Sequence, residues 1–162
     1  MRTDDVARTL ADLFSELIAG PSASGAYMLN AGDEGLLASL DTLPATAASA
    51  LTPTGSSIAA HVDHVRYGLS LLNRWSAGAN PFENADWSAS WKHTAVSDEE
   101  WWALCVDLRL EAGRWLKTLG TPREVNEIEW HGLIGSIAHL AYHLGAIRQI
   151  NHALRGPAEP SR

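Results

Sequence analysis

The stretch from residue 57 to residue 77, SIAAHVDHVRYGLSLLNRWSA, decides the fold class of this chain. Its apolar residues recur at spacings of three and four, which is typical of an amphipathic helix. They form two adjacent stripes, and the remaining side, with Asp63 and Arg66, is polar. The first stripe consists of Ile58, Val62, Val65, Leu69 and Leu72. The second consists of His61, His64, Gly68, Leu71 and Trp75. A face this wide contacts two neighbours, so the stretch predicts one helix of a bundle.

Three further long helices are predicted around this stretch. They span residues 3–19, 97–119 and 130–154, with a shorter helical piece over residues 33–40. Gly20 and Pro21 end the first of them, and Ser97 with Glu100 forms a capping box at the start of the second. No segment alternates convincingly as a strand. The sequence therefore predicts an all-α four-helix bundle that forms a single domain over residues 1–162.

The composition argues against several functional classes. The chain has 162 residues and a net charge of -7, without a run of lysine or arginine, which disfavours nucleic acid and anionic membranes as partners. Its one cysteine, Cys105, allows no intramolecular disulfide and fits a small buried apolar residue. We recognise neither a signal peptide nor an apolar stretch long enough to span a membrane. These features predict a soluble, cytoplasmic protein.

Histidines provide the candidate chemistry. His139 and His143 are four residues apart in the last predicted helix, so they share a face and can give two nitrogens to one metal ion. The segment HLAYH lacks the glutamate of the H-E-x-x-H zinc proteases, which excludes that class. Either His61 or His64 could supply a third ligand, and three imidazoles with one open position suit zinc, nickel, copper or iron. Hydrogen-bonded core histidines would give the same pattern, so spacing alone leaves both interpretations open.

Two motifs resemble the DinB/YfiT-like superfamily. The segment SIAAHVDHV, residues 57–65, is similar to a second-helix pattern in which Ser-Ile precedes the metal histidine by seven residues. The segment HLAYHLGAIRQ, residues 139–149, resembles the H-x-x-x-H-x-G signature of the last helix. Their order and spacing fit over nearly the whole chain. The resemblance implies a DinB-like four-helix bundle and a homodimer. It also implies one divalent metal with an open coordination position, bound by His64, His139 and His143.

The resemblance also implies a class of function. Some branches are S-transferases or isomerases that use a low-molecular-weight thiol such as bacillithiol, mycothiol or glutathione, and many other members have no known activity. A divalent metal lowers the pKa of a bound thiol or water and so produces a nucleophile near neutral pH. We expect a metal-dependent thiol S-transferase with zinc as the first candidate metal and nickel or iron after it. The substrate, the catalytic residues and the thiol-binding residues are unknown.

Two other interpretations compete with the enzyme. One is a non-enzymatic metal- or ligand-binding stress-response protein, and the other is a bundle whose histidines are purely structural. Metal content separates the structural interpretation from both metal-binding ones. Turnover that is lost on chelation separates the enzyme from the binding protein.

The remaining candidate residues have simpler interpretations. For His61, a packing role is favoured over contact with a metal ligand. For Tyr142, packing or a surface position is favoured. Arg148 is expected to pair with a carboxylate such as Glu16 or Glu111, with an anionic cofactor as the alternative. The other histidines are assigned to the surface or to a helix start: His93, His131 and His152. Most of the seven tryptophans are assigned to core and dimer packing, with a tryptophan-lined pocket near the metal as the alternative.

Overall fold

A computed structural model describes residues 2–23 and 25–158. Across these ranges the regular structure is helical, with two isolated β-bridges and no β-strand. The all-α prediction is therefore confirmed. The chain divides into two compact units, one formed by Met1–Asp41 with Leu119–Arg162 and the other by Thr42–Thr118. The four-helix bundle and the single domain stay predictions.

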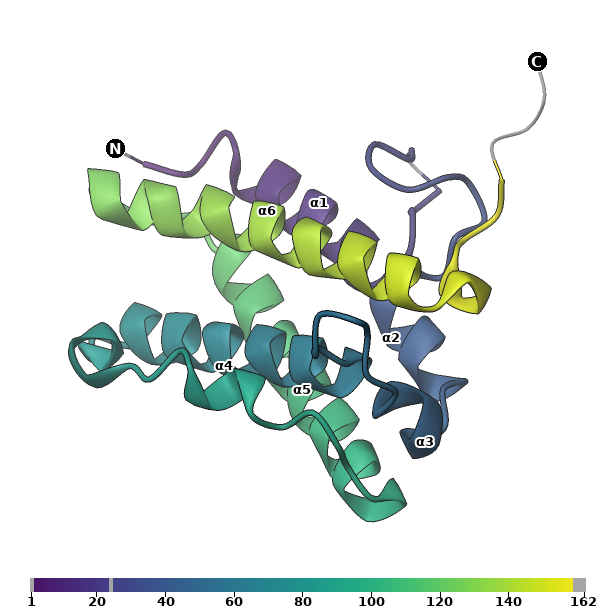
Figure 1. Cartoon of the computed structure of the whole chain (residues 1–162). Helices are drawn as coiled ribbons and strands as arrows, with labels where there is room; N and C mark the ends of the chain where they lie inside the picture. The colour runs from purple at the N-terminus through teal and green to yellow at the C-terminus, as the bar shows by residue number, and fades with distance from the viewer. Residues whose placement is uncertain (1, 24, 159–162) are drawn as a thin grey trace. The chain divides into compact units, whose positions relative to one another are not determined.

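Two long helices build the first unit (Figure 1). Helix α1, Ala7–Ala19, contacts both α2, Gly35–Asp41, and α6, Glu127–Ile150, and the short 3-10 helix η3, His152–Leu154, follows α6. The largest fully buried apolar side chains of these helices are Phe14, Leu17, Leu36, Leu40, Leu140 and Ile147. Each contributes roughly 1.5–3 kcal/mol on leaving water. This packing fixes the helix that carries His139 and His143.

The junction between α1 and α2 depends on two glycines. Gly20 and Gly35 adopt φ of +86° and +74°, and a Cβ at either position would collide with backbone atoms of the other helix end. Gly20 ends α1 as predicted. The start of α1 was predicted at Thr3, but the helix begins at Ala7. The earlier residues form a turn, because the Thr3 amide donates to the carbonyl of Arg123 at 3.0 Å.

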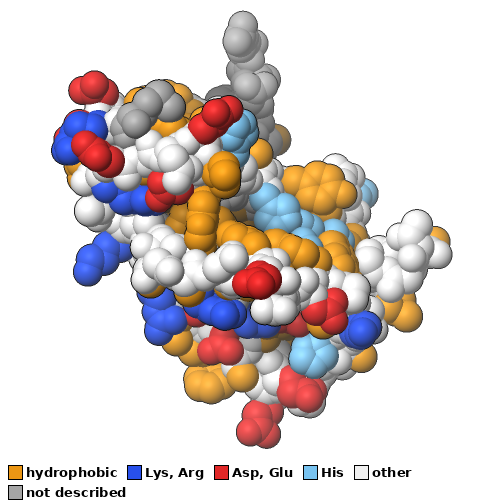
Figure 2. All heavy atoms as spheres, turned by 90° about the vertical axis from the view of Figure 1, so that its left-hand side faces the viewer, with side chains coloured by type: hydrophobic (Ala, Val, Ile, Leu, Met, Phe, Trp, Pro, Cys, Tyr) orange, Lys and Arg blue, Asp and Glu red, His pale blue; other side chains and the backbone are white. Residues whose placement is uncertain are grey.

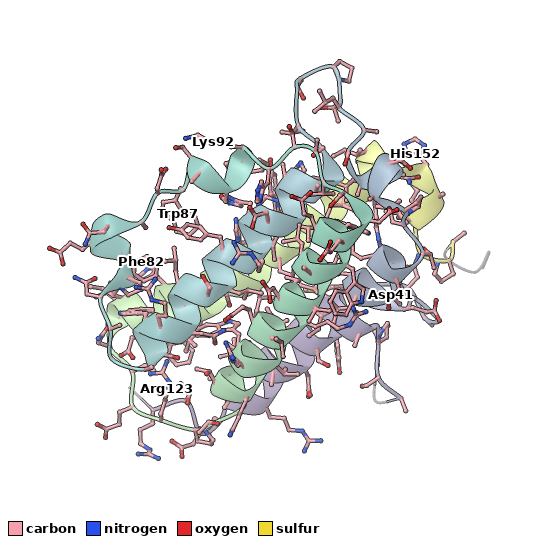
Figure 3. The ribbon with its side chains drawn as sticks, turned by 90° about the horizontal axis from the view of Figure 1, so that it is seen from below. Asp41, Phe82, Trp87, Lys92, Arg123 and His152 are labelled. Atoms are coloured by element: carbon pink, nitrogen blue, oxygen red, sulfur yellow. The ribbon has the colours of Figure 1, made fainter. Side chains whose placement is uncertain are left out.

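The second unit is organised around α4, Ile58–Ser76. It also contains α3, Ala45–Ala48, η1, Pro81–Asn84, η2, Ala89–Trp91, and α5, Asp98–Leu119. Asn73 ties α4 to α5, because its Nδ2 donates to the Glu111 carbonyl at 2.9 Å and to Glu111 Oε2 at 2.6 Å. The segment that carries η1 and η2 contacts α4. Figure 3 shows this segment running along α4 from Phe82 through Trp87 to Lys92.

Capping residues explain where the long helices begin. Ser57 Oγ accepts from the Ala60 amide at the start of α4, and the predicted Ser97–Glu100 capping box is present at α5. Helix α6 begins at Glu127, three residues before the prediction, because Asn126 and Glu129 form a second capping box. It ends at Ile150, earlier than the predicted residue 154, and the chain continues into η3.

Charged side chains of both signs lie at the surface. Acidic and basic side chains are interspersed on the face drawn in Figure 2, where histidines are also visible. Within the described part of the chain, no helix is both long and apolar enough to cross a membrane. The cytoplasmic location stays a prediction.

Candidate metal centre

His139 and His143 form a close imidazole pair on α6. Their Nε2 atoms lie 3.0 Å apart, and the ring planes are nearly perpendicular at 82°. His143 is fully buried and His139 is half-buried. Helix α6 carries no charged residue from Trp130 to Ile147, so no neighbouring carboxylate of the helix neutralises a cation there. The prediction that i,i+4 spacing brings these two rings together is confirmed.

The spacing and the protonation of this pair suit a metal. A tetrahedral zinc with Zn–N bonds of about 2.0–2.1 Å separates its nitrogen ligands by about 3.3 Å, close to the observed Nε2–Nε2 distance. Burial lowers the pKa of His139 below its ordinary value of about 6.5. The ring is therefore neutral at pH 7, and a neutral imidazole is the form that binds a metal.

His64 lies on α4, in the other unit, and is buried. The segment containing η1 and η2 surrounds it. The imidazole stacks on Trp91 with ring centroids 4.5 Å apart, and Trp87 packs at 5.6 Å with a tilt of 51°. Its Nδ1 is 3.0 Å from the hydroxyl of Ser90, which is itself buried. His64 is thus held by two indoles and one hydroxyl from a single loop.

Four of the seven tryptophans take one of two roles. Trp101 and Trp115 are buried as predicted, and Trp101 Nε1 donates to the Leu43 carbonyl at 2.7 Å. Trp87 and Trp91 instead are partly exposed and line His64. The sequence left a tryptophan-lined pocket near the metal as an alternative to core packing, and that pocket stays a prediction.

His61 is the neighbour that the sequence could not separate from His64. It is buried and packs edge-on against Trp91 with ring centroids 5.1 Å apart. Burial lowers its pKa, so the ring is neutral at pH 7. These observations agree with the packing role favoured from the sequence.

The other histidines and Tyr142 lie at the surface, as predicted. Tyr142 is 68% exposed and meets His143 edge-on at 5.1 Å. His131 is exposed, and its Nδ1 lies 2.8 Å from the Glu127 carbonyl of the first turn of α6. His93 and His152 are also exposed. Cys105 is buried in α5, in agreement with the sequence.

Asp63 departs from the prediction. The helix pattern placed it on the polar side of α4, but it is 5% exposed. Arg66 donates to its Oδ1 from Nε at 2.9 Å and from Nη2 at 2.6 Å, and His93 Nδ1 lies 3.2 Å from its Oδ2. A cavity of about 350 Å³ borders these groups, lined by Asp63, Arg66, Tyr67, Asp86, Ala89, Ser90, Lys92 and His93. The loop after α4 covers Asp63, which a helical pattern alone does not reveal.

Arg148 pairs with neither carboxylate named from the sequence. Its Nη2 donates to Asp33 Oδ1 at 2.8 Å, and both side chains are largely buried. Glu16 instead accepts three backbone amides of residues 27–29, and Glu111 pairs with Arg114. The structural ion pair predicted as the default is therefore present, with a different partner.

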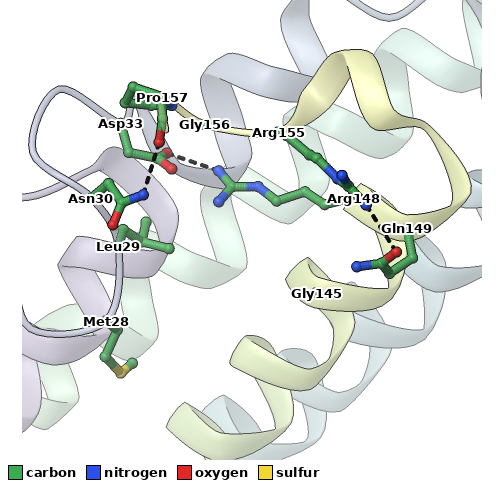
Figure 4. A pocket seen from close by; sticks show the side chains of 10 residues that line it. All are labelled: Met28, Leu29, Asn30, Asp33, Gly145, Arg148, Gln149, Arg155, Gly156 and Pro157. Carbon is green, nitrogen blue, oxygen red and sulfur yellow. Dashed lines mark hydrogen bonds and ion pairs between the residues drawn. The ribbon is translucent and has the colours of Figure 1, made fainter. Parts of the chain in front are cut away.

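The pair lies at a cavity of about 250 Å³ in the first unit (Figure 4). It is lined by Met28, Leu29, Asn30, Asp33, Gly145, Arg148, Gln149, Arg155, Gly156 and Pro157. Arg148 follows His139 by nine residues, or two and a half helical turns, so the cavity is on the opposite face of α6 from the histidine pair. Its Asp33 already neutralises Arg148, which disfavours the anionic-cofactor alternative.

Comparisons with known proteins give no family. No family model matches the chain, and no curated protein or solved structure matches it. Membership of the DinB/YfiT-like superfamily, and the roles that it implies for His64, His139 and His143, therefore stay predictions.

Proposed function

We propose that this protein binds one divalent transition metal through His64, His139 and His143 and uses it in thiol S-transfer. The 3.0 Å separation of the two Nε2 atoms on α6 carries the metal part of this proposal. These three histidines are a group that could hold a metal ion, which supports it further. The thiol and the transfer reaction rest on the resemblance in sequence.

The donor set fits a catalytic type of metal site. Three neutral imidazoles leave the full charge on a divalent ion and leave one position for water or substrate. A bound zinc, nickel or iron would lower the pKa of a thiol in that position. The chain supplies His139 in its neutral form, and burial of His143 keeps competing water from its ring.

Elemental mass spectrometry of the purified, untagged protein tests the metal. We expect close to one zinc, nickel or iron per chain, and a sharp loss of that metal in His139→Ala. His131→Ala is the matched control, because it removes an exposed histidine from the same helix. Absence of metal, with reconstitution failing for all three ions, would remove the proposed function and favour structural histidines.

Turnover tests the thiol chemistry separately. Bacillithiol, mycothiol and glutathione are each supplied with a generic electrophile, and product is measured before and after chelation. We expect turnover with one thiol that disappears with the metal and returns on reconstitution. Stoichiometric metal without turnover for any thiol would favour the non-enzymatic binding protein.

A homodimer is part of the same proposal. The exposed face of α6 is uncharged over Trp130–Ile147 and presents Ile134 and Tyr142, which suits contact with a second copy. Sedimentation velocity should give a dimer that Ile134→Glu disrupts. A monomer at all protein concentrations would contradict this part of the proposal.

A further inference from the structure

Ser90 makes two contacts through one hydroxyl. Its Oγ donates to the Trp87 carbonyl at 2.9 Å and lies 3.0 Å from Nδ1 of His64. A hydroxyl has a single hydrogen, and a carbonyl oxygen can only accept. The hydroxyl hydrogen of Ser90 is therefore donated to the carbonyl oxygen of Trp87. The contact with His64 is then satisfied only if Nδ1 carries the proton and Ser90 Oγ accepts it.

We infer that Ser90 is a positioning residue that holds neutral His64 as the Nδ1–H tautomer. The lone pair of the ring then resides on Nε2. Histidine in water prefers the opposite tautomer, with the proton on Nε2, so the protein reverses the intrinsic preference. The consequence for metal binding rests on the proposed function, because Nε2 is the nitrogen that would ligate the ion. The tautomer itself is inferred from the contacts of Ser90, without reference to a metal.

The loop that carries Ser90 is anchored tightly enough for this role. Asp86 Oδ1 accepts from the amide of Ser88 at 3.0 Å, from its hydroxyl at 2.6 Å and from the amide of Ala89 at 3.1 Å. The Asp86 amide in turn donates to the phenol of Tyr67 at 3.1 Å. Tyr67 is on α4, three residues after His64. The turn that places Ser90 is thus tied to the helix that places His64.

The opposite assignment leaves a poor contact. If Ser90 donated to His64, two oxygen atoms without a hydrogen between them would face each other 2.9 Å apart at the Trp87 carbonyl. Ser90 is 4% exposed, so water has little access to relieve that contact. An unsatisfied buried polar group costs about 1–3 kcal/mol. The Nδ1–H form is therefore strongly favoured.

The contact between Ser90 and His64 should strengthen metal binding. A histidine that ligates a metal commonly donates its other ring N–H to a protein oxygen, which fixes both the tautomer and the ring orientation. Loss of such a partner typically lowers metal affinity about 10–100-fold. Stacking on Trp91 restrains the same ring from its face. Ser90 and Trp91 together present Nε2 in one orientation.

Nitrogen-15 NMR of the imidazoles in the metal-free full chain tests the tautomer. The spectra are recorded at about pH 8, above the ordinary histidine pKa of about 6.5, and His64→Gln assigns the signals of His64. Ser90→Thr and Ser90→Val are isosteric and differ only in the hydroxyl, so they form a matched pair. We expect Nδ1–H in the wild type and in Ser90→Thr, and a shift toward Nε2–H in Ser90→Val. Zinc affinity should fall about 10–100-fold in Ser90→Val and recover in Ser90→Thr.

The outcomes separate this inference from the proposed function. A wild-type spectrum with the proton on Nε2 overturns the inference without reference to any variant. An unchanged tautomer in a folded Ser90→Val protein, checked by circular dichroism, also overturns it. The expected tautomers together with no zinc binding in any protein would uphold the role of Ser90 and reject the metal.

Discussion

At the scale of single residues, the three proposed ligands are held by different means. His139 and His143 are brought together by helix periodicity, which the sequence shows directly. His64 is oriented by Ser90 and Trp91, which follow it by 26 and 27 residues. A loop contact of this kind depends on the tertiary fold, so the helical spacing offered His61 or His64, the resemblance selected His64, and neither could predict Ser90. The partner of Arg148 was wrong for the same reason, since Asp33 is 115 residues away.

The ion pair between Asp33 and Arg148 should be important for stability. Asp33→Asn keeps the shape of the side chain and leaves the arginine charge buried without its counter-charge. Breaking a buried pair in this way costs roughly 3–5 kcal/mol, so the free energy of unfolding in urea should fall by about that amount. Adding Arg148→Met should recover part of the loss. A double variant less stable than Asp33→Asn would contradict this explanation.

The stability of the protein should depend on pH through His139. Its pKa is lower in the folded protein than in the unfolded chain, so the unfolded state binds more protons between the two values. The stability contribution is complete above a pH of about 6.5 and decreases as the pH falls through the lower folded pKa. Protons also compete with a metal for the imidazole nitrogens, so metal affinity decreases as the pH falls. Zinc affinity measured by chelator competition should therefore decrease below a pH of about 6.5, and His139→Ala should flatten the stability profile.

At the scale of elements, long helices were predicted well and their surroundings were not. Helices α4 and α5 begin and end within one residue of the predicted bounds, and Ser57 and Ser97 cap their starts. The sequence did not predict the short helices α3, η1 and η2, since each has four or fewer residues and no periodic pattern. The helical pattern did not predict the burial of Asp63, because a loop distant in sequence covers this side chain and the pattern describes only the helix itself.

The early start of α6 gives an element-scale prediction. Asn126 Oδ1 accepts from the Glu129 amide at 3.0 Å, and Asn126→Ala removes this cap. The free energy of unfolding should fall by about 1 kcal/mol, within the usual range of about 0.5–2 kcal/mol. Asn126→Asp is the matched control and should stay close to the wild type, because aspartate caps about as well. Equal losses in both variants would show that the cap does not stabilise α6.

At the scale of the whole molecule, helical periodicity predicted the all-α class and a four-helix bundle, while the resemblance implied the homodimer and the thiol. The all-α class is confirmed by the structure, and the others stay proposals that solution experiments decide. The reason is physical: helical periodicity and caps are local signals, whereas the association of elements and copies depends on contacts between residues far apart in the chain.

Removal of the metal should lower the stability of the molecule. An ion that binds only the folded chain, at a free concentration one hundred times its Kd, adds about 2.7 kcal/mol. For a domain of this size that corresponds to a rise in Tm of about 5–10 °C. Differential scanning calorimetry with and without EDTA should show this difference in the wild type and lose it in His64→Ala. Equal Tm values in the wild type with and without EDTA would contradict folded-state metal binding.

His64, His139 and His143 are proposed to share one metal ion. Zinc affinity, measured by competition with a chromophoric chelator in three single alanine variants and in His131→Ala, tests this claim most directly. We predict a single site in the wild type, a loss of at least about 100-fold at each of the three positions, and no change at His131. Wild-type affinity in His64→Ala would contradict the shared site and leave the α6 pair to bind without it.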